Sequence, residues 1–400
     1  MKTKAILLMA VMVVLGVKSY AQNQILGQSL NPNVITTAVP FLSISPDARG
    51  GSLGDCGVAS DPDVYSMHYN PAKYTFMESD MSVGLGYSPW LRNLVPDMNL
   101  AYLAFAYKLN SESALAATLR YFSCGEITFR DINGTSLGDY KPNEWALDAT
   151  YSRMLTDYLS GAVAGRFIYS NLTQGQGDGS SVGWSVAADV AVYYKRPVEW
   201  FRDMDADFAW GVSINNIGSK VSYNNTSIDK DFIPTTLRFG PSLKLQLDDY
   251  NSLAFMVDVT KLLVPTPPTY YPGTDSIVYG VSDDVSVPVG IIQSFFDAPG
   301  YSFTDQGDVV GNGRFYEELC EYNIGVGVEY WYNHIFAVRA GYFNETAMKG
   351  NRKYVTLGAA LKYNVFGLDV SYLVPVNGTV GTNPLENTLR FNLTYDIVSK

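Results

Sequence analysis

The sequence predicts an all-β fold, a transmembrane antiparallel β-barrel of fourteen strands with an N-terminal hatch or plug. Three observations predict it: an export signal, apolar and polar residues that alternate over most of the chain, and connections that are alternately long and short. The last segment alternates most clearly, because Leu389, Phe391 and Leu393 are interleaved with Arg390 and Asn392. Successive side chains of a strand face opposite sides, so this segment has one apolar face and one polar face.

Residues 1–21 have the organisation of a signal peptide. Lys2 and Lys4 precede an apolar run at 5–17, and Ser19-Tyr20-Ala21 resembles a cleavage site. The run is shorter than the roughly 20 residues that a membrane-spanning helix needs, so cleavage is favoured over an uncleaved anchor. The mature chain is then predicted to begin at Gln22 in an exported, oxidising compartment.

Composition bounds the class of protein without deciding it. Aromatic residues make up 14%, with 29 tyrosines, which suits the interfacial rings of a barrel but also a soluble β-protein. The formal net charge of −11 argues against a nucleic-acid partner. The odd number of cysteines (Cys56, Cys124 and Cys320) permits at most one internal disulfide and leaves their redox state open.

Residues 22–79 lack sustained alternation and contain many glycines and prolines. A segment that precedes the first strand starts in the periplasm and can fold into the lumen, so we expect a hatch or plug here. Its most distinctive residues are Pro46, Asp47 and Arg49, followed by Asn70 and Pro71.

Residues 80–400 are predicted to form the barrel itself. Strands of about 9–11 residues with a period of two can cross a membrane at a tilt. A large soluble β-protein also alternates, so the period alone does not separate the two. The predicted strands are 81–87, 99–108, 114–123, 144–154, 158–170, 182–195, 207–215, 235–247, 251–261, 321–332, 335–345, 353–363, 367–374 and 388–398.

The connections favour the membrane barrel. Those after odd-numbered strands are long, and those after even-numbered strands are short, with 196–206 as the exception. Long loops outside and short turns in the periplasm are typical of outer-membrane barrels. We therefore expect an outer-membrane location, with the hatch and the C-terminus on the periplasmic side and the long loops extracellular.

The inward face carries charges of both signs: Arg120, Arg166, Asp189, Glu329, Arg339 and Glu345. Such residues either hold a plug through ion pairs or line a wet channel. The plug is favoured, because residues 22–79 must be accommodated.

No catalytic or metal-binding arrangement is evident. The two histidines, His68 and His334, are too few for a three-histidine zinc site, and no G-x-S-x-G elbow is present for a hydrolase acting through His68. We predict a protein that is not an enzyme and has no cofactor.

The connection at 262–320 is far longer than ordinary loops, and such loops are usually functional or disordered. It opens with a proline-rich stretch and contains an apolar run at 287–296, which either packs on its own barrel or contacts another protein. The candidate partner-binding residues are Pro267, Tyr270, Ile291, Ile292, Phe295, Phe296, Asp297 and Pro299.

Short motifs spread over nearly the whole mature chain carry a family resemblance. They are Pro40-Phe41-Leu42, Pro46-Asp47-Ala48-Arg49, Tyr69-Asn70-Pro71-Ala72, Pro89-Trp90-Leu91, residues 294–300, residues 339–343 with Lys349-Gly350, and Pro384-Leu385 with residues 387–391. In order and spacing the chain resembles the PorV family of the Bacteroidetes type IX secretion system, which is related to FadL-type barrels. It departs from the family at Tyr69, where Trp is commoner, and at Tyr301, where the family tends to have a second glycine.

The resemblance implies a FadL-like barrel that collects cargo bearing a C-terminal signal domain and carries it to the cell-surface attachment machinery. The implied partners are the type IX translocon barrel, cargo signal domains, an attachment complex with a sortase-like protease, and outer-membrane lipid. The alternative is FadL-like transport of hydrophobic small molecules.

Overall fold

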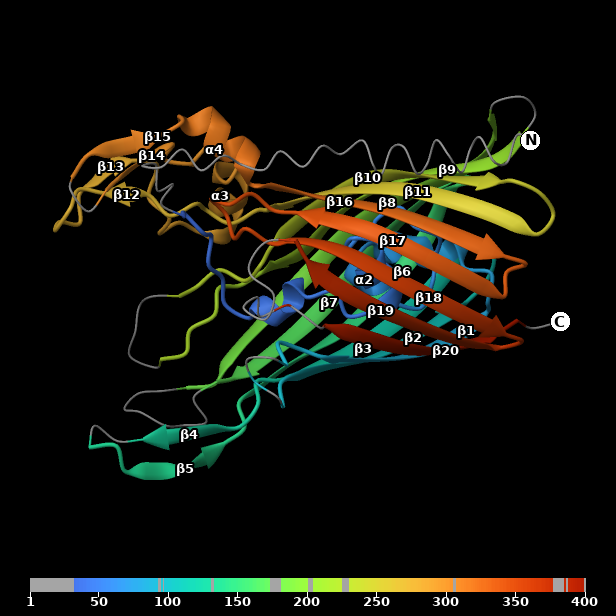
Figure 1. Ribbon diagram of the computed structural model, residues 1–400, viewed down its shortest axis with the longest axis horizontal. Helices are drawn as coiled ribbons and strands as arrows, with labels where there is room; N and C mark the ends of the chain where they lie inside the picture. Colours follow the sequence, from blue (N-terminus) through green and yellow to red (C-terminus); the bar gives the residue numbers. More distant parts are fainter. Residues whose placement is uncertain are drawn as a thin grey trace. The chain divides into compact units, whose positions relative to one another are not determined.

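Fourteen antiparallel strands form a closed barrel in the computed structural model, as predicted (Figure 1). The structure describes residues 32–92, 95, 97–130, 133–172, 181–200, 204–224, 230–304, 307–376, 385 and 388–398. Neighbours follow chain order, and β20 pairs with β1 to close the sheet, so that no strand edge runs along the barrel wall. The strands are β1 (Met81–Pro89), β2 (Asn99–Lys108), β3 (Ser113–Ser123), β6 (Asn143–Thr156), β7 (Leu159–Asn171), β8 (Gly183–Trp200), β9 (Met204–Gly218), β10 (Thr236–Gln246), β11 (Asn251–Leu262), β16 (Tyr322–Tyr332), β17 (Phe336–Asn344), β18 (Lys353–Tyr363), β19 (Phe366–Pro375) and β20 (Leu389–Ile397).

The alternation separates the two faces of the wall. In β20, Arg390 and Asn392 are buried, whereas Phe391 and Leu393 are exposed on the outside. Apolar side chains are likewise exposed along the other barrel strands, which is the arrangement that lipid requires. Among the described residues, no helix is both long and apolar enough to span a bilayer.

Aromatic side chains gather near both ends of the strands. Trp145 stacks on Tyr169 with ring centroids 5.3 Å apart at the end where β6 begins. Tyr194 stacks on Trp210 at 5.8 Å near the opposite end. Rings at these two levels match the interfacial belts of membrane barrels.

The two ends of the barrel differ in their connections. Long connections join β1 to β2, β3 to β6, β7 to β8, β9 to β10, β11 to β16, β17 to β18 and β19 to β20, and tight turns close the other end. The predicted exception at 196–206 was wrong, because β8 continues to Trp200 and β9 starts at Met204. This hairpin extends past its neighbour, since β7 pairs with β8 only as far as Leu159 opposite Tyr194.

Two of the long connections contain secondary structure that the sequence did not predict. The connection after β3 forms a hairpin of β4 (Ile127–Arg130) and β5 (Ser136–Tyr140). The connection after β11, residues 263–321, is called the cap below. It contains β12 (Thr269–Tyr270), β13 (Ile277–Tyr279), α3 (Val287–Gln293), β14 (Tyr301–Phe303), β15 (Val309–Gly311) and α4 (Arg314–Cys320).

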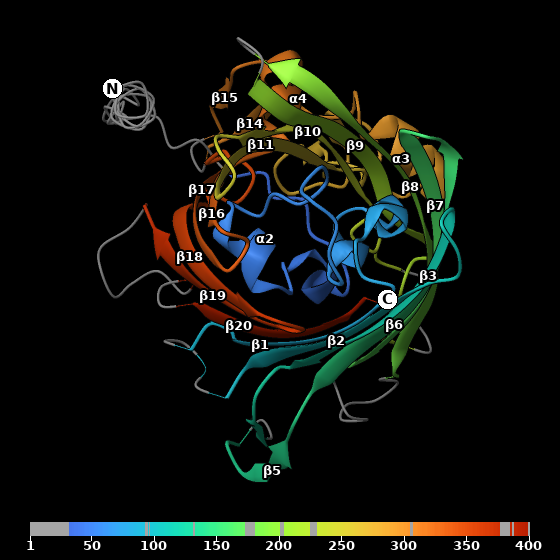
Figure 2. The ribbon, with the colours of Figure 1, turned by 90° about the vertical axis from the view of Figure 1, so that its right-hand side faces the viewer.

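Residues 40–80, called the luminal segment below, lie inside the ring of strands (Figure 2). They form short helical turns: η1 (Pro40–Ser43), α2 (Ala48–Ser52), η2 (Ser66–His68) and η3 (Pro71–Phe76). Residues 32–39, which precede it, start at the long-loop end, where the Asn33 amide donates to Met348 O at 2.9 Å. The sequence predicts that the hatch begins at residue 22 on the opposite side. The predicted signal peptide and residues 22–31 lie outside the described residues.

Candidate functional site

The cap exposes apolar side chains at the long-loop end of the barrel. Ile292 is 65% exposed and Phe296 is 52% exposed, and Phe315 on α4 reaches 77%. Val289, Phe295, Tyr316 and Leu319 add to this surface. We call these seven residues the cap surface. Apolar side chains that a long connection leaves exposed favour contact with another protein.

The predicted loop residues divide into two groups. Tyr270, Ile292, Phe295 and Phe296 are exposed, as a partner-binding role requires. Pro267 and Ile291 are partly buried, and Asp297 and Pro299 are buried inside the cap, so these four support the surface rather than form it.

Helix α4 was missed because its amphipathic pattern is inverted. Phe315, Tyr316 and Leu319 face outward, while Glu317 and Cys320 are buried. Apolar residues at helical spacing ordinarily mark the face toward the core, so the sequence pattern points the wrong way here.

Buried ion pairs connect the cap to neighbouring parts of the barrel, and we call them the cap cluster. Lys349 Nζ lies 2.8 Å from Glu317 Oε1 and 3.0 Å from Glu321 Oε1. Lys261 in β11 pairs with Glu321 and lies 3.6 Å from Glu318. Each lysine therefore bridges two carboxylates, and the cap is tied both to the barrel wall and to the connection after β17.

Asp297 lies among these acidic groups. Its Oδ2 accepts from the Thr266 amide at 3.1 Å and its Oδ1 lacks a partner among the described residues. The pKa of Asp297 is raised to about 6, chiefly by burial and also by the charges of Glu321 and Glu318, against the lowering effect of the Thr266 bond. This carboxyl therefore changes charge near pH 6, well above the range of an ordinary aspartate.

The predicted hatch residues build the luminal segment. Asp47 caps α2 by accepting from the Gly50 amide at 2.7 Å, directly after the buried Pro46. Asn70 caps η3 through the Ala72 amide at 3.0 Å, and Pro71 occupies the first turn. The Asn70 amide nitrogen also donates to Val192 O in β8 at 3.0 Å, so this motif joins the segment to the wall.

A second set of buried ion pairs, called the luminal cluster, fixes Arg49. Its guanidinium donates to both oxygens of Glu329, at 3.0 and 2.8 Å, and pairs with Asp63 at 3.0 Å. Arg339 donates to Glu329 at 2.6 Å and to Asp369 at 2.5 Å. Two of the predicted inward charges thus hold the luminal segment: Glu329 binds Arg49 directly, and Arg339 acts through its bond to Glu329.

The other predicted luminal charges have different partners. Arg120 donates to Leu42 O at 2.9 Å and contacts His68. Arg166 pairs with Asp148 at 2.5 Å and Asp189 at 3.0 Å, entirely within the wall. Glu345 does not lie on the luminal wall, because β17 ends at Asn344. It pairs instead with Arg352 across the connection that follows.

Wall glycines let the luminal segment approach closely. A Cβ at Gly341 would lie 2.1 Å from Gly54 N, and one at Gly211 would lie 2.3 Å from Val58 O. Glycine in a strand often marks such close approach of another backbone. The wall is therefore shaped around the luminal segment, a feature that the sequence shows only as glycines in strands.

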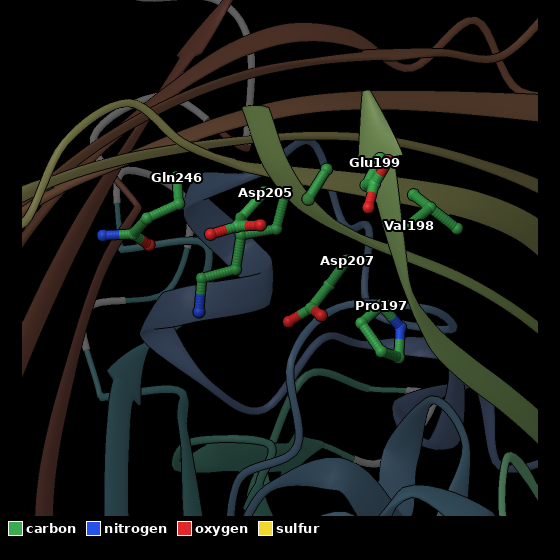
Figure 3. A pocket seen from close by; sticks show the side chains of 8 residues that line it. Pro197, Val198, Glu199, Asp205, Asp207 and Gln246 are labelled. Carbon is green, nitrogen blue, oxygen red and sulfur yellow. The ribbon is translucent and has the colours of Figure 1, made fainter. Parts of the chain in front are cut away.

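Two cavities lie at the short-turn end. One of about 460 Å³ lies along the extended β8–β9 hairpin and is lined by Glu199, Asp205 and Asp207 among others (Figure 3). The second, of about 610 Å³, is bordered by the luminal segment and the ends of several strands. Lys244 lines both cavities and pairs with Asp61 at 2.7 Å. Neither of these two cavities lies at the cap.

The described residues contain no group of three or more His, Cys, Asp or Glu side chains placed to hold a metal. His68 lies between Arg120 and Arg238, and burial together with these cations keeps its pKa well below the usual value. His334 lies in the β16–β17 turn, as predicted. The three cysteines are free thiols.

Comparison with solved structures returns barrels of low similarity. The CymD monoaromatic hydrocarbon channel is 12% identical and aligns over 89% of this chain and 98% of its own, with a TM-score of 0.46. The Pseudomonas putida toluene transporter TodX is 12% identical over 86% and 95%, with a TM-score of 0.44. No curated protein matches the chain. The family model described as type IX secretion system protein PorV matches residues 27–269, so the chain belongs to the PorV family.

Proposed function

We propose that this outer-membrane protein of type IX secretion binds the C-terminal signal domain of cargo that leaves the translocon barrel. It then carries the cargo to the surface attachment complex with its sortase-like protease. The cap is the docking element, and the long-loop end is extracellular, with the short turns and the C-terminus in the periplasm. The observation that carries this proposal is the exposed apolar surface on α3 and α4.

The physical support is the contrast between the two sides of the cap. Its glutamates lie against Lys261 and Lys349, while Ile292, Phe296 and Phe315 are exposed. Exposed aromatic and aliphatic side chains on a supported frame supply the central contacts of many protein interfaces. Because the cap cluster already holds the frame, a partner gains affinity without first ordering it.

The test is a triple variant, Ile292→Ser, Phe296→Ser and Phe315→Ser. It removes exposed apolar area while leaving the cap cluster intact. Each side chain contributes about 1–2 kcal/mol when a partner buries it, so recovery of cargo should fall at least about tenfold. The measurement is co-purification from native membranes, with signal-bearing cargo and the translocon barrel quantified by mass spectrometry.

The matched control is Ile127→Ser, which removes an exposed apolar side chain from the β4–β5 hairpin at the same end. It should leave cargo recovery unchanged, and heat-modifiable migration on gels should show that both variants retain the barrel. Wild-type recovery of cargo by the triple variant would overturn the docking role of the cap.

The alternative, transport of hydrophobic small molecules, needs a continuous apolar passage from the outer loops into the lumen. The luminal segment instead meets the wall through the ion pairs of Arg49 and through Asp258, which accepts from the Gly57 and Val58 amides at 2.7 and 2.8 Å. These polar contacts favour the carrier role. Saturable uptake of a hydrophobic solute by vesicles that contain the purified protein would favour transport.

A further inference from the structure

Residues 32–39, called the strap below, connect the cap to the luminal segment. The Asn33 side chain donates to Glu317 Oε1 at 2.9 Å and to Pro267 O at 3.2 Å, both in the cap. The Asn33 amide donates to Met348 O at 2.9 Å. One residue of the strap therefore contacts two separate long connections.

Glu317 is the point where these segments meet. It is buried in α4, and its Oε1 accepts from Asn33 and from Lys349 at 2.8 Å. Its Oε2 accepts from the Gly300 amide at 2.7 Å. A displacement of α4 would therefore remove the acceptor of Asn33 together with an ion-pair partner of Lys349.

The strap leads directly into the lumen. The Ala38 amide donates to Phe232 O at 2.9 Å, and Val39, Phe41 and Leu42 are buried in an apolar cluster that includes Phe122 on the wall. The chain then continues without a break into α2 and on to Cys56. Residues 34–37 alone separate the Asn33 contacts from the Ala38 contact, and a chain this short limits how far one end moves without the other.

We propose that the strap is a mechanical coupling, through which displacement of α4 in the cap loosens the docking of the luminal segment in the barrel. The coupling goes beyond the carrier role, because it does not depend on which partner displaces the cap. A partner that binds the cap surface and pulls on α4 would then alter the luminal side of the barrel as well.

Two native thiols report on the two ends of this coupling. Cys320 lies in α4, and Cys56 is fully buried in the luminal segment. Burial raises the pKa of the Cys56 thiol well above its usual value, so the docked segment protects it from modification. Cys124→Ser with Cys320→Ser leaves Cys56 as the only cysteine, and Cys56→Ser with Cys124→Ser leaves Cys320.

The test measures maleimide labelling rates of the full-length protein in membrane vesicles, without cargo. Glu317→Gln removes the charge that binds Lys349 and one of the two acceptor oxygens of this side chain. Asn33→Ala is the milder variant, because it removes only the side-chain contacts of the strap. Asp275→Asn, which removes an exposed charge from the cap, is the matched control.

Glu317→Gln should raise labelling of both Cys320 and Cys56 by about tenfold, and Asn33→Ala should raise Cys56 labelling by about fivefold. The control should change neither rate. The coupling is overturned if Glu317→Gln accelerates Cys320 while Cys56 keeps its wild-type rate. It is equally overturned if Asn33→Ala leaves Cys56 unchanged. Heat-modifiable migration verifies that each variant retains the barrel, and cargo recovery plays no part in the readout.

Discussion

The luminal cluster and the cap cluster are both buried networks of ion pairs, yet they are built from different cations. The luminal cluster uses Arg49 and Arg339, and Arg49 binds both oxygens of Glu329. The cap cluster uses Lys261 and Lys349, each of which contacts its carboxylates through a single nitrogen. A guanidinium fixes direction as well as distance, whereas an ammonium is a point charge on a flexible stem.

This difference indicates different tasks. The luminal segment is fixed in one position by directional pairs and by the glycines of the wall. The cap is held by charges that tolerate small displacements, which suits an element that must contact partners. Removing the shared carboxylate from each cluster tests the distinction.

The largest effect is expected for Glu329→Gln. The substitution keeps the shape but leaves Arg49 with Asp63 and Arg339 with Asp369, in a site where Glu329 is 2% exposed. Loss of one partner from a buried pair costs about 3–5 kcal/mol, because the remaining charge stays desolvated. We expect Cys56 labelling to rise more than a hundredfold, as measured with the Cys56-only protein. Labelling within threefold of wild type would show that the luminal cluster does not hold the segment.

The barrel was predictable because the lipid imposes one rule on every strand. Each wall strand must place apolar residues outward and polar residues inward, so the alternation recurs in segments such as 143–156, and the alternately long and short connections separate a membrane barrel from a soluble β-protein. The prediction failed where that rule relaxes. Residues 196–200 and 204–206 lie past the end of β7, and Pro197 and the charged residues around it resemble a loop although β8 and β9 remain paired there.

The cap was less predictable for a physical reason. Sequence periodicity identifies a buried face by its apolar residues, but α4 buries Glu317 beside Lys349 and exposes Phe315. Only the positions of Lys261 and Lys349 in the folded protein show which face of α4 is buried. The apolar run at 287–296 was recognised because it was continuous, whereas residues 314–320 carry both acidic and apolar side chains.

A smaller effect is expected for Glu321→Gln in the cap cluster. Lys261 keeps Glu318, and Lys349 keeps Glu317, so neither lysine is left unpaired. We expect a loss of about 1–3 kcal/mol in cap stability and a rise of about tenfold or more in the labelling of the Cys320-only protein. A rise as large as that of Cys56 in Glu329→Gln would show that the two clusters are equally rigid.

The next change, Arg49→Lys, converts the luminal cluster to the chemistry of the cap cluster. It keeps the charge but removes the two parallel bonds to Glu329, so we expect a cost of about 1–2 kcal/mol. Cys56 labelling should rise by about tenfold, and Cys320 labelling should stay near wild type. The reciprocal variant Lys349→Arg provides the control for side-chain size, and it should not accelerate Cys56.

The smallest effect concerns pH, and it should distinguish the cap from the lumen. Asp297 has a pKa of about 6 in the closed cap, above its ordinary value of 3.8, so the closed cap binds a proton more readily than an open one. Cap stability should therefore rise as pH falls from 8 to 5, since protonation removes a buried charge beside Glu318 and Glu321. The burial that raises the pKa of Glu318 acts in the same direction.

Because thiol labelling itself depends on pH, the measured quantity is the ratio of Cys320 labelling in the Cys320-only protein to that in its Asp297→Asn derivative. This ratio should be about three at pH 8, and it should approach one at pH 5. A ratio that does not change with pH would show that Asp297 keeps the same charge throughout this range.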